Sequence, residues 1–211
     1  MKFIGFYNYT VILTYMSLIS GVIGMKCAFD GKLGFAMGCL IFSGVCDMFD
    51  GVVARSKKNR TADEKNFGIQ IDSLCDAVCF GVFPAIFLYF SGVNTIHGFA
   101  ILVFYVLCAV IRLAFFNVLE INRQMNETGC AKGYRGLPVT SAAIIFPLIY
   151  LLDIAFIPNN IMNIIYYIIP CITGILFITD FRFPKVDIGK ILRKLFLKKQ
   201  TDVEEVIYYE N

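Results

Sequence analysis

The chain has 211 residues, of which 58% are hydrophobic, and its mean hydropathy is +0.70. This composition is too apolar for an ordinary soluble domain and is typical of a polytopic membrane protein. The formal net charge of +3 favours contact with anionic lipid at the membrane surface. Because the sequence predicts no soluble basic face, it argues against nucleic acid as a partner.

The apolar segments predict six membrane-spanning helices, each of about 20 residues. The expected spans are residues 9–25, 33–54, 68–92, 96–119, 138–157 and 160–180. The first span lies where a signal peptide would lie, but it lacks a small-residue cleavage site and five more spans follow it. We therefore expect an all-α, polytopic membrane protein in which residues 1–184 form one membrane domain.

A different pattern follows the last span. Apolar residues recur at helical spacing between 185 and 199, and the basic residues lie largely elsewhere around the turn. This predicts an amphipathic helix on the membrane surface, with packing against the membrane domain as the alternative. Residues 185–211 are thus expected to form that interfacial helix and an acidic tail.

The basic residues predict how the chain is oriented, because Lys and Arg collect in cytoplasmic loops. They lie mainly in the segments 55–65, 123–135 and 182–199, whereas the opposite loops carry only Lys26 and Lys32. Both termini and residues 56–67 are therefore expected in the cytoplasm. The aspartates described next would face the cytoplasm from a protein integral to the cell membrane.

Four aspartates lie at the ends of the second and third spans. Asp47 and Asp50 are spaced i,i+3, and Asp72 and Asp76 are spaced i,i+4, so each pair projects from one face of its helix. A carboxylate at the centre of a membrane helix costs roughly 2.5–3.5 kcal/mol, which makes such residues functional candidates. Two faces of this kind can form an all-oxygen cage, and hard ions such as Mg²⁺ or Mn²⁺ prefer oxygen ligands.

Small and basic residues accompany these carboxylates. Gly51 and Gly68 lack a Cβ and allow a phosphate or a second backbone to approach closely. Arg55 offers a planar guanidinium suited to phosphate. The pattern therefore points to a metal-dependent site for a phosphate compound.

At these positions the chain resembles the CDP-alcohol phosphotransferase family, whose signature is D-x2-D-G-x2-A-R, a gap, then G-x3-D-x3-D. The fixed positions are all filled, by Asp47, Asp50, Gly51, Ala54, Arg55, Gly68, Asp72 and Asp76. The gap of twelve residues between Arg55 and Gly68 is longer than in the most familiar members and resembles the phosphatidylserine synthase branch.

The resemblance implies a role for each of these positions. Two divalent ions would be held by the four aspartates, and Asp76 would also act as the base that takes the proton of an alcohol. Gly51, Ala54, Arg55 and Gly68 would line the site for CDP-diacylglycerol. The reaction implied is transfer of the phosphatidyl group to that alcohol with release of CMP, in a protein that forms homodimers.

A second cluster resembles the CDP-diacylglycerol–serine O-phosphatidyltransferases of that family. Arg112 lies in R-L-A-F-F-N within the fourth span, and Arg135 lies in G-Y-R-G-L-P at 133–138. A buried arginine needs an anionic partner, so we expect Arg112 to face the aspartates, a cavity or a substrate group, or to form a structural ion pair. Phe115 stands where that branch has a second arginine, and Arg135 can supply the missing charge. Arg112 and Arg135 are thus expected to bind the acceptor, L-serine.

Other interpretations stay open at this point. The acceptor can instead be another small alcohol, such as glycerol 3-phosphate or inositol phosphate. Carboxylates inside membranes also line ion paths, but the spans beyond the aspartates are apolar, which disfavours a cation transporter. Lys57 or Lys58 can hold the CDP phosphates, although a solvated loop is the simpler interpretation.

The eight cysteines show no C-x-x-C pair and are interpreted as packing residues. Cys75 and Cys79, which flank Asp76, would suit zinc better than Mg²⁺.

Overall fold

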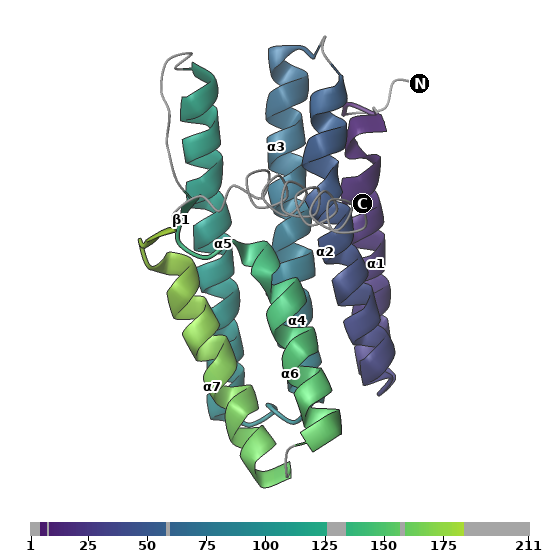
Figure 1. Ribbon diagram of the computed structural model, residues 1–211, viewed down its shortest axis with the longest axis vertical. Coiled ribbons are helices and arrows are strands. Elements are labelled where there is room, and N and C mark those ends of the chain that lie inside the picture. The colour runs from purple at the N-terminus through teal and green to yellow at the C-terminus, as the bar shows by residue number, and fades with distance from the viewer. Residues whose placement is uncertain (1–4, 8, 58–59, 126–133, 157–158, 184–211) are drawn as a thin grey trace, which may run out of the picture.

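The structure is a computed structural model that describes residues 5–7, 9–57, 60–125, 134–156 and 159–183. Figure 1 shows its helices packed side by side along the long axis of the molecule. They are α1 (Ile12–Phe29), α2 (Leu33–Ser56), α3 (Ala62–Asp76), α4 (Phe83–Phe90), α5 (Ile96–Met125), α6 (Ala142–Phe156) and α7 (Asn159–Ile178). Short 3-10 turns at Tyr9–Val11 and Val139–Ser141 precede α1 and α6, and a π-helical segment at Ala77–Val82 joins α3 to α4.

The expected all-α membrane fold is confirmed. In the described part of the chain, five helical segments are long and apolar enough to cross a membrane, namely Tyr9–Phe29, Leu33–Ala54, Ala62–Phe90, Ile96–Asn122 and Ile161–Ile178. The remaining expected span corresponds to a shorter apolar helix, Val139–Ala155. The β-structure in the described part of the chain is one two-residue pair, β1 (Tyr134–Arg135) with β2 (Arg182–Phe183). The amphipathic helix and acidic tail expected at 185–211 lie outside the described residues.

The third span begins earlier than the sequence pattern indicated. Residues 56–67 were expected to form a loop, but α3 begins at Ala62. The backbone N–H of Glu64 donates to the Thr61 hydroxyl (3.2 Å), and the Thr61 N–H donates to the Glu64 carboxylate (3.3 Å). This reciprocal capping box satisfies donors at the start of the helix, so charged residues continue the helix beyond its apolar part.

The π-helical segment follows directly after Asp76 and leads into Pro84. Proline has no amide hydrogen for the carbonyl four residues earlier, which here belongs to Phe80. The buried Tyr105 hydroxyl of α5 donates to that carbonyl at 2.6 Å. Tyr105 therefore links α5 to the π-helical segment that follows the last aspartate.

Small residues hold α1 against α2. The hydroxyl of Ser17 donates to the Ser43 carbonyl (3.2 Å), and the hydroxyl of Ser43 donates to the Ser17 carbonyl (2.9 Å). A Cβ at Gly21 would lie 2.8 Å from the Cys79 sulfur. Small residues allow such close approach of helices in a membrane, and this contact places α1 beside the aspartate-bearing part of α2 and the π-helical segment.

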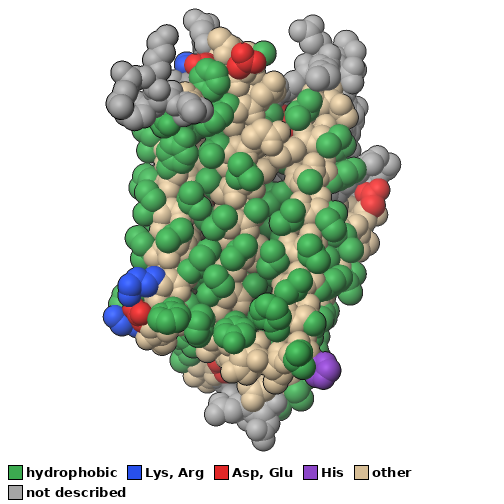
Figure 2. Space-filling view, turned by 180° about the vertical axis from the view of Figure 1, so that it is seen from behind, with side chains coloured by type: hydrophobic (Ala, Val, Ile, Leu, Met, Phe, Trp, Pro, Cys, Tyr) green, Lys and Arg blue, Asp and Glu red, His purple; other side chains and the backbone are tan. Residues whose placement is uncertain are grey.

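The outer surface fits a lipid environment. Figure 2 shows a face that is covered largely by hydrophobic side chains, with the charged side chains gathered mainly toward its two ends. In Figure 1 the start of α1, the α2–α3 connection and the end of α5 lie at one end of the molecule. The turns after α1 and α4 lie at the other end, as an integral membrane protein with the expected topology requires.

Candidate active site

The structure brings together three of the four aspartates. Asp47 and Asp50 lie on the last turns of α2, and Asp72 lies on α3. One carboxylate oxygen from each of these residues lies within 4.8 Å of the other two. The two helix faces therefore meet as the residue spacing predicted.

Asp76 lies one turn beyond Asp72, at the end of α3. The residue is 8% exposed, and its carboxyl interacts electrostatically with that of Asp47. It is not one of the three residues whose oxygens converge. Asp76 is thus adjacent to the cluster but differently placed from the other three aspartates.

Two carboxylate oxygens of the cluster, Asp50 Oδ2 and Asp72 Oδ1, have surroundings that favour binding of a ligand. The Thr14 hydroxyl of α1 donates to Asp50 Oδ2 at 3.1 Å, which fixes one side of that carboxylate. Asp72 Oδ1 is buried and has no hydrogen-bond partner among the described residues. A buried acceptor without a partner is costly. The all-oxygen donor set and this oxygen fit a hard divalent cation.

The small residues of the motif lie within about one turn of the aspartates. Gly51 and Ala54 follow Asp50 on α2, and Gly68 precedes Asp72 on α3. A Cβ at Gly68 would lie 2.5 Å from Nη2 of Arg60, so this position is closely covered. The side chain of Arg55 lies outside the described part of the structure.

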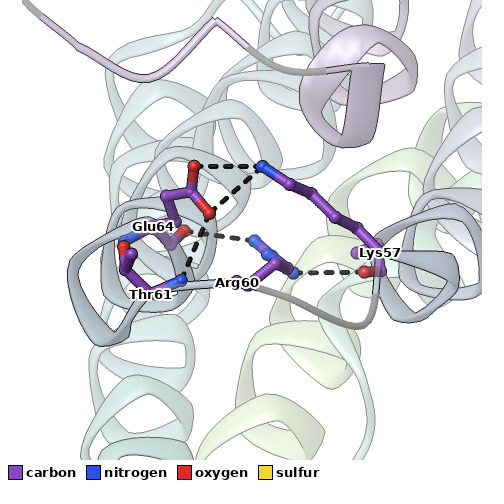
Figure 3. A network of polar contacts seen from close by, with 5 residues as sticks. Lys57, Arg60, Thr61 and Glu64 are labelled. Carbon is purple, nitrogen blue, oxygen red and sulfur yellow. Dashed lines mark hydrogen bonds and ion pairs between the residues drawn. The ribbon is translucent and has the colours of Figure 1, made fainter.

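The α2–α3 connection forms a polar network at this end of the bundle (Figure 3). Lys57 Nζ pairs with both carboxylate oxygens of Glu64, at 3.0 and 3.2 Å. Arg60 donates to the carbonyl of Ala54 (3.4 Å) and to that of Glu64 (3.1 Å). The pairing of Lys57 with Glu64 favours a structural role for this lysine over a hold on phosphates, whereas Lys58 lies outside the described residues.

Arg112 lies beside the G-L-P segment rather than in the carboxylate cluster. Its side chain is 9% exposed, and Nε donates to the Leu137 carbonyl at 3.2 Å. Asp180 lies within electrostatic range of the guanidinium. Gly136 has a φ of 71°, a left-handed conformation that favours glycine, and it lets the chain turn closely around Arg112. The structure describes the backbone of Arg135 in β1, but its side chain lies outside the described residues.

Phe115, which departs from the serine-enzyme pattern, is 46% exposed on α5. Nearby on the same helix, Asn117 interacts with α3. The Ser73 hydroxyl donates to its side-chain oxygen (2.5 Å), and its amide donates to Gln70 (3.3 Å).

Sequence reasoning assigned no role to Asn117 or Thr14. Asn117 was noted only as the last residue of R-L-A-F-F-N, and Thr14 only as a polar side chain in an apolar span, and neither signal identifies the partner. In the structure these residues connect α5 and α1 to the helices that carry the aspartates, so they belong to the support of the site.

Comparison with known proteins agrees with this geometry. A protein-family model described as CDP-alcohol phosphatidyltransferase matches residues 7–177. The chain is 32% identical to the archaetidylserine synthase of Methanothermobacter thermautotrophicus over 83% of this chain and 69% of that protein. It is 30% identical to the CDP-diacylglycerol–serine O-phosphatidyltransferase of Helicobacter pylori, over 90% of this chain and 78% of that protein. It is 37% identical to the protein of that name from Saccharomyces cerevisiae, over 57% of this chain and 44% of that protein.

Proposed function

Because the chain belongs to the CDP-alcohol phosphatidyltransferase family, we propose that it transfers the phosphatidyl group of CDP-diacylglycerol to the hydroxyl of L-serine, releasing CMP. The observation that carries this proposal is the convergence of Asp47, Asp50 and Asp72 from two helices. The serine acceptor is supported by relatives over most of the chain whose names include serine.

The metal ligands we propose are Asp47, Asp50, Asp72 and Asp76. The first three supply the converging oxygens, and Asp76 is proposed to bind the metal more loosely. Two Mg²⁺ or Mn²⁺ ions, when bound, would neutralise the pyrophosphate and hold the attacking and leaving oxygens in line. The unpartnered Oδ1 of Asp72 supports this ligand role. Thr14 keeps the Asp50 carboxylate oriented toward the same space.

Asp76 is the base in this proposal. It takes the proton of the serine hydroxyl as the serine oxygen bonds to the lipid-bearing phosphorus. The bond from that phosphorus to the bridging oxygen breaks, and CMP leaves with the electron pair. A carboxylate outside the converging set suits this role, because a carboxylate bound tightly to metal is a poor base.

Gly51, Ala54, Arg55 and Gly68 are proposed to line the CDP site. Arg112 and Arg135 are proposed to hold the serine carboxylate, since a buried carboxylate requires a cation. The contact between Arg112 Nε and the Leu137 carbonyl supports this by fixing the direction of the guanidinium. We further propose that the site opens to the cytoplasm, where the nucleotide lipid is available, and that the protein acts as a homodimer in the cell membrane.

A CMP-release assay on purified protein tests the proposal. The acceptors are serine, glycerol 3-phosphate, inositol, inositol 1-phosphate and choline, each with CDP-diacylglycerol and Mn²⁺. We expect serine to be preferred, and Arg135→Ala to raise the KM for serine. Preference for a phosphorylated acceptor would overturn the serine assignment, and absence of CMP release with every acceptor would overturn the activity.

A further inference from the structure

Arg60 spans the two helices that carry the aspartates. Its Nη1 donates to the carbonyl of Ala54 near the end of α2, and its Nη2 donates to the carbonyl of Glu64 in the first turn of α3. Figure 3 shows the guanidinium between these two helix ends. The family signature does not include Arg60, because it lies in the gap between Arg55 and Gly68.

The guanidinium also lies near the carboxylate cluster, against Gly68 of α3. Ala54 follows Asp50 by four residues, and Gly68 precedes Asp72 by four. Residues at this spacing share a helix face, about one turn of 5.4 Å apart. Since Nη2 would be 2.5 Å from a Cβ at Gly68, the positive charge stands about one turn from the aspartates, on the side of the α2–α3 connection.

Arg60 forms no ion pair with a carboxylate among the described residues. The carboxylate of the neighbouring Glu64 pairs with Lys57. The Nε of Arg60 is buried and has no hydrogen-bond partner within the described structure. A half-buried guanidinium whose Nε–H has no acceptor can bind an anion that offers several oxygen atoms.

We propose that Arg60 binds the phosphate on the CMP side of CDP-diacylglycerol, as a substrate contact that the family signature lacks. This inference rests on the proposed function, because it places the nucleotide against Gly68. The planar fork of arginine matches two phosphate oxygens. In this proposal phosphate oxygens replace the two backbone carbonyls that accept from Arg60 in the structure.

A purely structural role is the competing explanation, since basic side chains commonly bond the last carbonyls of a helix. Such a role would lower the melting temperature of an Arg60 variant by the same amount with and without nucleotide. A phosphate contact would instead reduce the rise in melting temperature that the nucleotide produces.

The test compares wild type, Arg60→Met and Lys65→Met as full-length proteins in detergent. Lys65→Met is the matched control, because it removes an exposed cation near the start of α3 and leaves both the Arg60 guanidinium and the Lys57–Glu64 pair in place. Binding of CMP with Mn²⁺, and of CDP-diacylglycerol, is measured by calorimetry. We expect Arg60→Met to weaken both about tenfold, the effect of losing charge-assisted hydrogen bonds, with cytidine binding and the KM for serine unchanged.

Binding of both nucleotides by Arg60→Met at wild-type affinity would overturn the inference, as would an equal loss in Lys65→Met. If Arg60→Met does not fold, the same binding measurement is made on Arg60→Lys, which keeps the positive charge but lacks the planar guanidinium. Weaker CMP binding by that variant supports the inference, and wild-type binding overturns it. Failure of the wild-type protein itself to bind CDP-diacylglycerol or release CMP would contradict the proposed function instead.

Discussion

Two buried polar regions of this protein satisfy their hydrogen bonds differently. In the carboxylate cluster, Asp72 Oδ1 is buried without a partner in the described structure. In the aromatic core, the Tyr105 hydroxyl donates to Phe80, and its ring contacts Phe146 and Phe177 edge-on or tilted. Unmet polar groups cost stability, whereas matched ones hold helices together. We infer that the carboxylate cluster is arranged to bind a ligand, whereas the aromatic core stabilises the fold.

The largest expected effect is that of a substitution at Asp72, which should lower turnover without lowering stability. Asp72→Asn removes a charged metal ligand, so we expect turnover to fall by a factor of about 10³ or more, as for loss of a principal transition-state contact. Its melting temperature should be unchanged or higher, because the variant buries no unpaired charge. CMP release and thermal unfolding in detergent measure the two effects.

The control for Asp72→Asn is Asp153→Asn on α6, where the Tyr166 hydroxyl donates to the carboxylate at 2.8 Å. An asparagine oxygen can still accept that bond, so turnover should stay near the wild-type value. Wild-type turnover in Asp72→Asn would contradict the ligand assignment.

A substitution at Asp76 tests whether the aspartates of the cluster differ in role. Asp76→Asn should lower turnover by a factor of about 10²–10⁴, the usual contribution of a general base. Because its oxygen is not one of the converging set, Mn²⁺-dependent binding of CDP-diacylglycerol should remain close to wild type. Calorimetry measures that binding, and loss of binding in parallel with turnover would make Asp76 an essential metal ligand instead.

Tyr105 tests the other region. Tyr105→Phe leaves the Phe80 carbonyl buried without its donor, so the free energy of unfolding should fall by about 1–3 kcal/mol. Turnover of the folded protein should change little. Denaturant unfolding in mixed micelles measures the loss. The control is Tyr89→Phe, at a position that is 40% exposed on α4, where no measurable loss is expected.

The smallest expected effect is at Thr14. Thr14→Val removes the donor to Asp50 Oδ2 and keeps the side-chain shape, so the Mn²⁺ concentration for half-maximal turnover should rise severalfold, by at most about 100-fold. Thr10→Val removes an equally buried hydroxyl that donates to no described carboxylate, and it should leave the metal requirement unchanged. Equal effects of the two substitutions would assign Thr14 to packing alone.

Much of this architecture was predictable from the sequence. Apolar length predicts the spans, and the i,i+3 and i,i+4 spacing of the aspartates predicts that they share helix faces. These are properties of one helix at a time. The start of α3 was also encoded locally, in the Thr61–Glu64 capping box, but the charged segment was interpreted as a loop.

Contacts between helices were not predictable in the same way. The bond from Thr14 to Asp50 and that from Tyr105 to Phe80 each depend on the rotation and height of two helices. Periodicity specifies neither quantity. The roles of Arg55 and Arg135 stay predictions, since their side chains are not described.

The paired serines between α1 and α2 have a consequence for how the protein adapts to different bilayers. The hydroxyls of Ser17 and Ser43 each bond to the other residue's carbonyl, and a slide of one residue would move the helices about 1.5 Å and break both bonds. A helix in a bilayer of the wrong thickness normally adjusts by tilting or shifting. Here α1 and α2 must tilt as one body, so Thr14 and Asp50 keep the same relative height in thin and thick membranes.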